Sequence, residues 1–187
     1  SYFYLFSVQR LGLTLILTFI LTMKKNMDRE KYWNVDYTKY WKKRVCEANF
    51  KEGQSKVIIG DNVTIKDSIY SEAISLLTIT KKDTLLEIGC GFGRSLPELC
   101  RIAKKVTASD ISESMISSSK ENKERNLEFA VTESENMPFS SNYYNVVICF
   151  AAFDAMYQTK ALIEINRVCK IGGRVLITGK SDCYFIN

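Results

Sequence analysis

The fold is decided by the stretch Thr84-Leu-Leu-Glu-Ile-Gly-Cys-Gly-Phe-Gly-Arg-Ser-Leu96. It opens with the short apolar run 85–88, which is typical of a buried strand. Three glycines follow at alternate positions, and apolar residues at helical spacing then predict a helix over 94–103. A strand, a glycine loop and a helix in this order bring a ligand against backbone N–H groups. An ordinary turn between a strand and a helix is the plainer alternative.

Composition narrows the class of protein. The chain has 187 residues, of which 46% are hydrophobic and 25% charged, and this predicts one globular domain. Residues 1–56 hold 11 Lys and Arg against 5 Asp and Glu, whereas residues 57–187 hold 15 against 16, so no nucleic-acid partner is expected for the core. The absence of histidine excludes histidine acid–base chemistry, and no metal is expected. Six scattered cysteines without a Cys-x-x-Cys pair predict a reduced, cytoplasmic protein.

The N-terminal third divides into two segments. Residues 1–23 form a hydrophobic leader whose uncharged run 11–23 would span about 20 Å as a helix, against about 30 Å of hydrocarbon. Three interpretations stay open: sequence upstream of the working protein, a membrane anchor, or a cleaved signal. Residues 24–65 are predicted as an aromatic and basic helical cap that packs on the core or covers the site as a lid, with a loop over 51–66. The core is assigned to residues 66–187.

Further short strands follow the glycine loop at regular intervals. They are predicted near 106–110, 127–131, 143–150 and 174–178, with helices between them, one of which begins near Ser112 and another of which ends at the glycine pair 172–173. This alternation predicts an α/β, Rossmann-like doubly wound fold with a mostly parallel sheet of about five strands and helices on both faces. Asp110 ends the second strand, where an α/β nucleotide site places its acceptor for the ribose hydroxyls. An N-cap for the next helix is the alternative role for Asp110.

Four motifs in this order carry a family resemblance. Glu-x-Gly-x-Gly-x-Gly at 87–93, the strand ending at Asp110, Glu133-Ser-Glu-Asn-Met-Pro-Phe139, and the glycine pair before the last strand resemble the class I S-adenosylmethionine-dependent methyltransferases over about residues 66–180. The resemblance implies that S-adenosyl-L-methionine is the cofactor and that a methyl group passes to a small-molecule acceptor. The sequence names neither the acceptor nor a catalytic residue, and the oligomeric state is unknown. The resemblance implies a cofactor site made of Glu87, Gly89, Cys90, Gly91, Gly93, Asp110, Ile111, Met115, Glu133, Ser134, Glu135, Cys149 and Phe150.

Departures from the family pattern leave alternatives. Glu133 stands where relatives mostly have Asp, and Ile171 replaces a proline before the glycine pair. Relatives continue beyond the fifth strand, so the chain is expected to be truncated and its fifth strand to be an unpaired edge. A non-catalytic or truncated cofactor-binding domain, with or without a membrane tether through residues 11–23, is the second functional hypothesis. A nicotinamide-dependent oxidoreductase is disfavoured by Arg94, which stands where a dinucleotide loop has its third glycine.

Overall fold

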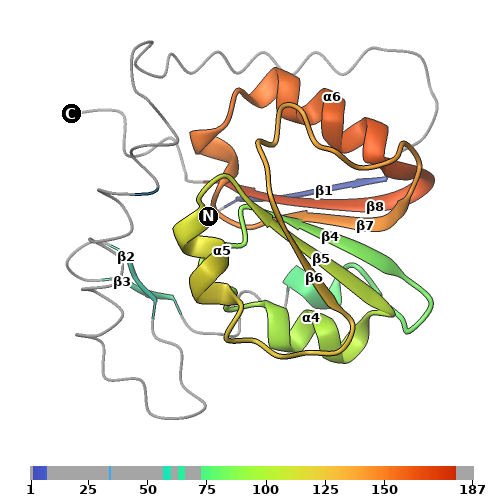
Figure 1. The fold of residues 1–187 in the computed structure, drawn as a ribbon. Coiled ribbons are helices and arrows are strands. Elements are labelled where there is room, and N and C mark those ends of the chain that lie inside the picture. Colours follow the sequence, from blue (N-terminus) through green and yellow to red (C-terminus); the bar gives the residue numbers. More distant parts are fainter. Residues whose placement is uncertain (1, 8–33, 35–56, 60–62, 66–72, 180–187) are drawn as a thin grey trace.

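The computed structural model describes residues 2–7, 34, 57–59, 63–65 and 73–179. At its centre lies a six-stranded sheet in the order β1-β8-β7-β4-β5-β6 (Figure 1). Five of these strands run parallel and confirm the predicted Rossmann-like sheet. They are β4 (Thr84–Ile88), β5 (Lys105–Asp110), β6 (Leu127–Val131), β7 (Tyr144–Cys149) and β8 (Cys169–Gly179).

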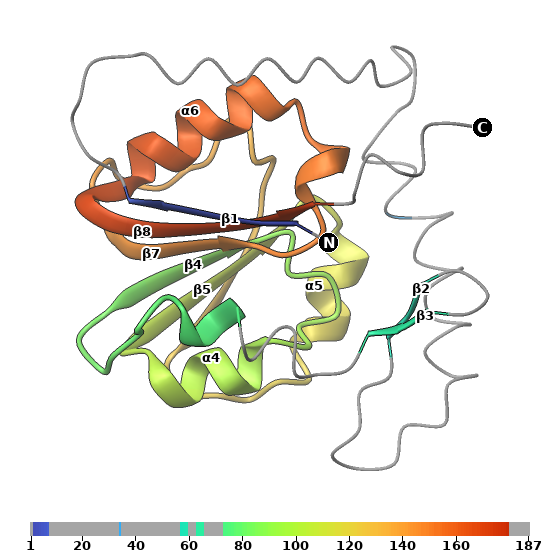
Figure 2. The same cartoon turned by 180° about the vertical axis from the view of Figure 1, so that it is seen from behind.

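Helices cover both faces of the sheet and divide the core into two clusters. α4 (Leu96–Ile102) and α5 (Glu113–Ser119) pack with the helical residues 73–75 on one face, and α6 (Gln158–Val168) packs on the other (Figures 1 and 2). Strand β4 serves both clusters, because Leu85 faces the first while Leu86 and Ile88 face the second. This two-sided burial explains why the β4 sequence is a nearly continuous apolar run rather than an alternating one.

The outer edge of β8 is paired. Strand β1 (Tyr2–Ser7) lies antiparallel beside it, with Tyr2 opposite Gly179 and Ser7 opposite Arg174. The expectation that this strand would be an unpaired edge is therefore wrong. The expectation considered only strands that follow β8 in sequence, whereas β1 comes from the opposite end of the chain.

Two local expectations are also corrected. The segment predicted as a loop contains an antiparallel pair, β2 (Val57–Ile59) and β3 (Val63–Ile65). Helix α6 ends at Val168 rather than at the glycine pair, because Cys169 is already extended and pairs with Tyr144 of β7. Gly172, at a φ of 76°, therefore bends strand β8 instead of capping a helix.

Arg174 fastens β8 to the segment that precedes β4. Its Nη1 donates to the carbonyl oxygens of Leu77 at 2.6 Å and Thr78 at 2.9 Å, and its Nη2 donates to Asp83 Oδ1 at 2.6 Å. Asp83 is buried, so this ion pair also neutralises a carboxylate that would otherwise be costly inside the protein.

The N-terminal assignments fall mostly outside the described residues. The run 11–23 lies there entirely, and of the predicted cap only residue 34 and strands β2 and β3 are described. Among the residues that the structure describes, no helix combines the length and the apolar character that crossing a membrane requires. Residues 2–7 of the predicted leader form β1 of the central sheet, while the rest of the leader and the helical cap stay predictions.

Candidate functional site

The glycine loop lies at the carboxyl end of β4, where ligands collect in parallel sheets. Gly89, Gly91 and Gly93 all have positive φ, at 70°, 54° and 75°. A Cβ on Gly89 would lie 2.4 Å from the Cβ of Ala152, whereas a Cβ on Gly91 would meet none of the described residues within 4 Å. Gly89 is therefore required by packing against the turn after β7, and no described side chain closes the space in which a ligand would touch the main chain of Gly91.

Hydrogen bonds hold the loop against the end of β5. The backbone N–H groups of Gly89 and Cys90 both donate to the carbonyl oxygen of Ser109, at 2.8 and 3.0 Å. The next N–H, of Gly91, donates to Asp110 Oδ2 at 2.9 Å. The loop is thus preorganised by its neighbour strand, and the acid at the end of that strand lies directly against it.

Asp110 is fixed by main-chain donors on both oxygens. Besides the bond from Gly91, its Oδ1 accepts from the N–H of Ser112 at 2.9 Å. Burial raises the pKa of this carboxyl, and the backbone N–H groups oppose that rise. Ser112 caps α5, since its side chain accepts from the N–H of Met115. The N-cap role considered for Asp110 therefore belongs to Ser112, and the contact of Asp110 with the ribose hydroxyls stays a prediction.

Glu87 is a buried acid with one unpartnered oxygen. It is 2% exposed, and its Oε1 accepts a short hydrogen bond from the Ser95 hydroxyl at the start of α4. Its Oε2 is buried without a hydrogen-bond partner among the described residues. Burial raises the pKa of Glu87 to about 7, with a smaller contribution from the charge of Asp110 and an opposing one from Ser95. An orphaned acceptor beside a glycine loop fits a cationic donor from a ligand.

The segment after β6 carries the other predicted acids. Glu133 is exposed two residues beyond the strand, whereas Ser134 is buried. Glu135 links two parts of the protein, because its Oε2 accepts from the Ser134 hydroxyl at 2.9 Å and its Oε1 from the N–H of Tyr157 at 2.7 Å. No local pattern indicated this link to the start of α6. The cofactor contacts predicted for these three residues stay predictions.

The end of β7 lies beside the end of β4 and completes the predicted cofactor crevice. Cys149 is fully buried in the cluster beneath α6, and burial raises the pKa of its thiol. Phe150 packs on the other cluster. Ala151 then has a φ of 52° and donates its N–H to Thr178 Oγ1 at 2.8 Å, before the short helix η2 (Phe153–Ala155). Left-handed backbone angles are uncommon for a residue other than glycine, and at Ala151 they place Ala152 against the glycine loop.

Two further predicted residues lie on α5 and before it. Met115 is buried among the helix residues that face the sheet, and Ile111 is half-buried between Asp110 and the cap residue Ser112. The structure thus gathers the predicted residues around the carboxyl ends of four neighbouring strands.

Sequence reasoning missed the serines that hold this arrangement. Ser95 and Ser109 bind Glu87, through its side chain and its carbonyl oxygen respectively. Ser112 donates to Asn34 Oδ1 at 2.8 Å, which brings one residue of the predicted N-terminal cap beside Asp110. Ser112 stood directly after the motif and offered a capping signal, but nothing in the local sequence indicated Asn34.

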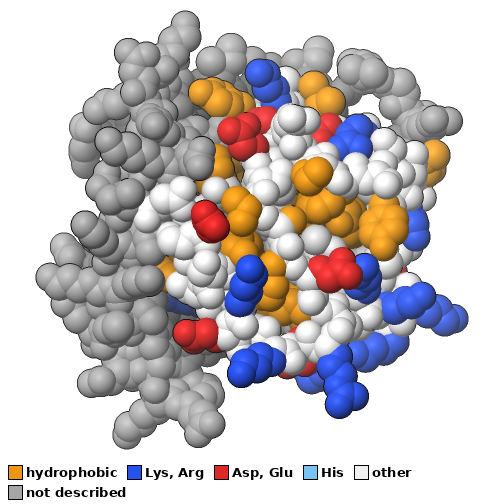
Figure 3. Space-filling model, in the orientation of Figure 1, with side chains coloured by type: hydrophobic (Ala, Val, Ile, Leu, Met, Phe, Trp, Pro, Cys, Tyr) orange, Lys and Arg blue, Asp and Glu red, His pale blue; other side chains and the backbone are white. Residues whose placement is uncertain are grey.

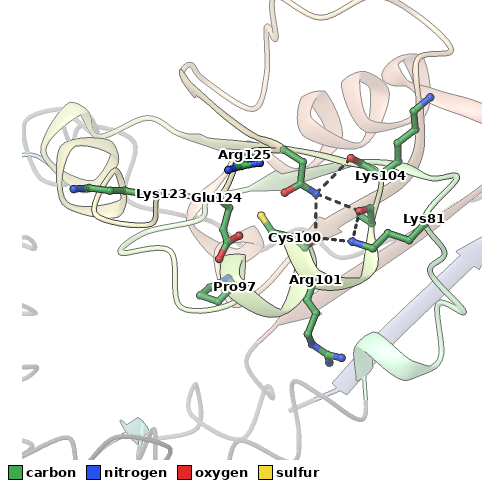
Figure 4. Close-up of a pocket in the computed structure, with 10 residues that line it drawn as sticks. Lys81, Pro97, Cys100, Arg101, Lys104, Lys123, Glu124 and Arg125 are labelled. Atoms are coloured by element: carbon green, nitrogen blue, oxygen red, sulfur yellow. Dashed lines mark hydrogen bonds between the residues drawn. The ribbon is translucent and has the colours of Figure 1, made fainter.

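A separate hollow lies at the opposite edge of the sheet. It has a volume of about 820 Å³ and is lined by residues that precede β4, β5 and β6, among them Lys81, Lys104 and Asn126 (Figure 4). Lys81 Nζ and Asn126 Nδ2 donate to the carbonyl oxygens of Cys100 and Ala103 at the end of α4. Lys and Arg side chains gather along this edge beside α4 (Figure 3). The hollow thus lies at the C-terminus of α4, whose last carbonyl oxygens accept from these donors, and not at the glycine loop.

Comparison with known proteins agrees with this geometry. Residues 86–177 match the family described as "Methyltransferase domain". The ubiquinone/menaquinone biosynthesis C-methyltransferase UbiE of Francisella philomiragia is 30% identical over 115 residues, which cover 57% of this chain and 46% of that protein. The chain therefore spans about half the length of the curated relatives that it matches.

Solved structures share the fold. A SAM-dependent methyltransferase from Aquifex aeolicus superposes with a TM-score of 0.50 at 25% identity, covering 54% of this chain and 57% of that one. The YcgJ protein of Bacillus subtilis gives a TM-score of 0.55 at 22% identity, over 57% of this chain and 48% of that one. Family match, relatives and fold agree on the same segment. Residues 86–177 therefore form a methyltransferase domain of the class I S-adenosylmethionine-dependent family.

Proposed function

We propose that the protein transfers a methyl group from S-adenosyl-L-methionine to a small-molecule acceptor. The observation that carries this proposal is the group of residues at the end of β4. Glu87 Oε2 is buried without a partner among the described residues, the Gly91 N–H binds Asp110, and a Cβ on Gly91 would meet no described residue within 4 Å. One acid suits an ammonium group and the other suits a pair of ribose hydroxyls, and bare main chain lies between them. The residues present therefore fit this cofactor.

Each side of the crevice has a proposed role. Glu87 would accept from the ammonium of the amino-acid part, and Gly89, Cys90, Gly91 and Gly93 would supply the main chain against which that part lies. Asp110 would accept from the ribose hydroxyls, while Glu133, with Ser134 and Glu135 beside it, would accept from the adenine amino group. The remaining predicted contacts are apolar and come from Ile111, Met115, Cys149 and Phe150.

The bound cofactor supplies an activated methyl group on a sulfonium, so the protein needs no proton relay of its own. The contribution of this chain is to hold the donor in line with the acceptor and to exclude water. Positioning of this kind supplies up to about 7–11 kcal/mol of the barrier. A chain without histidine is compatible with such a reaction.

The acceptor is proposed from the relatives. UbiE is named as a C-methyltransferase of ubiquinone and menaquinone biosynthesis, so a quinone precursor is the first acceptor to test. A cytoplasmic location, with membrane contact only through residues 11–23 if these act as an anchor, stays a prediction.

Calorimetric titration tests the cofactor. We expect S-adenosylhomocysteine to bind and NAD not to bind. The variant Asp110→Ala should raise the Kd for S-adenosylhomocysteine by about 100-fold or more, because two charge-assisted hydrogen bonds are lost. Glu121→Ala removes an exposed acid after α5 and is the control. Circular dichroism checks that both variants are folded, and an unchanged Kd in a folded Asp110→Ala protein would contradict the ribose assignment.

Turnover is a separate experiment. Methyl-labelled S-adenosyl-L-methionine is incubated with the protein and a panel of quinone precursors, and label in an extracted product is counted. Binding of S-adenosylhomocysteine without turnover of any acceptor would favour the non-catalytic alternative.

A further inference from the structure

We propose that Glu164 and Arg167 of α6 are positioning residues that fix the segment 132–139 and so determine how well the protein recognises the adenine amino group. The proposal rests on the proposed function, because that segment carries Glu133. Neither residue touches the crevice, and both act through the backbone of the segment.

The two side chains form one unit on the surface of α6. Arg167 Nε donates to Glu164 Oε1 at 2.6 Å, and Arg167 Nη2 donates to Glu164 Oε2 at 2.7 Å, which is a bidentate pair. The Arg167 guanidinium lowers the pKa of Glu164, so this carboxylate stays ionised at neutral pH. A surface ion pair three residues apart on a helix is worth only a few tenths of a kcal/mol, about 0.2–0.5, by itself.

The pair does more than that, because it binds both backbone groups of Met137. Glu164 Oε2 accepts from the Met137 N–H at 2.8 Å, and Arg167 Nη2 donates to the Met137 carbonyl oxygen at 2.8 Å. Arg167 Nη1 donates to the carbonyl oxygen of Phe139 at 2.6 Å. The side chain of Met137 is 3% exposed and packs in the cluster beneath α6, so the segment is held by its main chain and by its core contact together.

The other end of the segment is held as well. The Thr132 N–H donates to the carbonyl oxygen of Asp110 at 2.9 Å, and Glu135 accepts from the N–H of Tyr157 at the start of α6. Glu133 lies between these attachment points. These attachments and the anchor at Met137 together place its carboxylate relative to Asp110. Loss of the anchor at Met137 weakens the attachment on the C-terminal side of Glu133, where the bond at Glu135 remains.

The test uses a pair of ligands that differ in one group. S-inosylhomocysteine carries a carbonyl where S-adenosylhomocysteine carries the 6-amino group, so the ratio of their Kd values reports recognition of that group. We expect the wild-type protein to prefer the amino compound by about 10-fold or more, as a hydrogen bond to a charged acceptor implies. The ratio should fall towards one in Glu133→Gln, and also in Arg167→Ala although Arg167 lies outside the crevice.

The control is Arg101→Ala. Arg101 and Arg167 each lie in the last turn of a helix, α4 and α6 respectively. Arg101 is exposed, whereas Arg167 is half-buried, and Arg101 lies at the hollow on the other edge of the sheet. We expect it to leave the ratio unchanged. A purely stabilising role for Arg167 predicts a lower melting temperature with the ratio intact, and that result would overturn the proposal. Arg167→Lys keeps the charge but cannot form the bidentate pair with Glu164, so its ratio of Kd values should lie between those of Arg167→Ala and the wild-type protein.

Hydrogen exchange on the ligand-free protein gives an independent readout. In Glu164→Ala the Met137 amide should exchange at least about 10-fold faster, while the amides of β4 keep their wild-type rates. Unchanged exchange at Met137 would refute the anchor whether or not a cofactor binds. If the wild-type protein bound neither ligand, the proposed function and the role in recognition would both fall; normal binding with an insensitive ratio would remove this inference alone.

Discussion

Replacement of Glu87 by Gln should change how the stability of the protein depends on pH. The pKa of this acid is raised from its usual 4.5 to about 7 because the side chain is buried. Gln has the same shape, carries no charge and still offers an oxygen to the Ser95 hydroxyl. The variant is thus a permanent copy of the protonated state.

The direction in which pH changes the stability follows from proton binding to Glu87. Between pH values of about 4.5 and 7, the folded wild-type protein holds a proton on Glu87 that the unfolded chain has released. Stability from this group is therefore complete below the lower value and is lost as the pH rises through the upper one. A shift from 4.5 to about 7 corresponds to about 3 kcal/mol. The free energy of unfolding of Glu87→Gln, relative to that of the wild-type protein, should therefore rise by about 3 kcal/mol from acid to alkaline pH.

Urea unfolding measures this difference. The free energies of unfolding of both proteins are determined at several pH values from about 4.5 to 8.5, and the difference between the two proteins is plotted, because other carboxyls then cancel. Asp110 contributes to the raised pKa, so the difference should be smaller in an Asp110→Asn background. A difference between wild type and variant that does not change with pH would show that Glu87 is ionised throughout, and the reasoning from burial would be refuted.

Four other substitutions have outcomes that follow from the structure. Gly91→Ala should remain folded, with about 1 kcal/mol less free energy of unfolding because of its positive φ, but should lose S-adenosylhomocysteine binding in calorimetry. Gly89→Ala should lose about 2–4 kcal/mol of the free energy of unfolding, because its Cβ would overlap that of Ala152. Equal urea midpoints for the two variants would contradict this. Arg174→Ala should lower the free energy of unfolding by about 2–4 kcal/mol, since the buried Asp83 carboxylate and two carbonyl oxygens lose the hydrogen bonds that Arg174 donates. A change below about 0.5 kcal/mol would contradict a role for Arg174 in holding β8 to the segment before β4. Ser112→Ala should cost about 1 kcal/mol through loss of the α5 cap, visible as a lower thermal midpoint, and an unchanged midpoint would argue against the cap.

Local patterns predicted the parallel strands well because each pattern has a local physical cause. The third of them, 127–131, is observed as β6 with those bounds, and the acid at the end of β5 lies against the glycine loop as its spacing implied. The three glycines have the positive φ that such a loop requires. Periodicity and turn chemistry are properties of neighbouring residues, so sequence alone reveals them.

Features that depend on distant partners were not predictable in this way. Cys169 and the glycines after it read as a helix end, but pairing with β7 draws Cys169 into the sheet. Glu135 was predicted as a cofactor contact and Arg167 was not singled out, and only the fold shows that both bind the backbone of other segments. Gly60-Asp-Asn62 was a hairpin signal that composition alone had assigned to a loop.

The pairing of β1 with β8 has a consequence for synthesis on the ribosome. Tyr2 lies opposite Gly179, so it leaves the exit tunnel long before its partner in the sheet is synthesised. The nascent chain must therefore carry β1 unpaired until β8 has also emerged. Loop closure over such a separation is slow, so β1 is a natural client for a chaperone that shields extended segments.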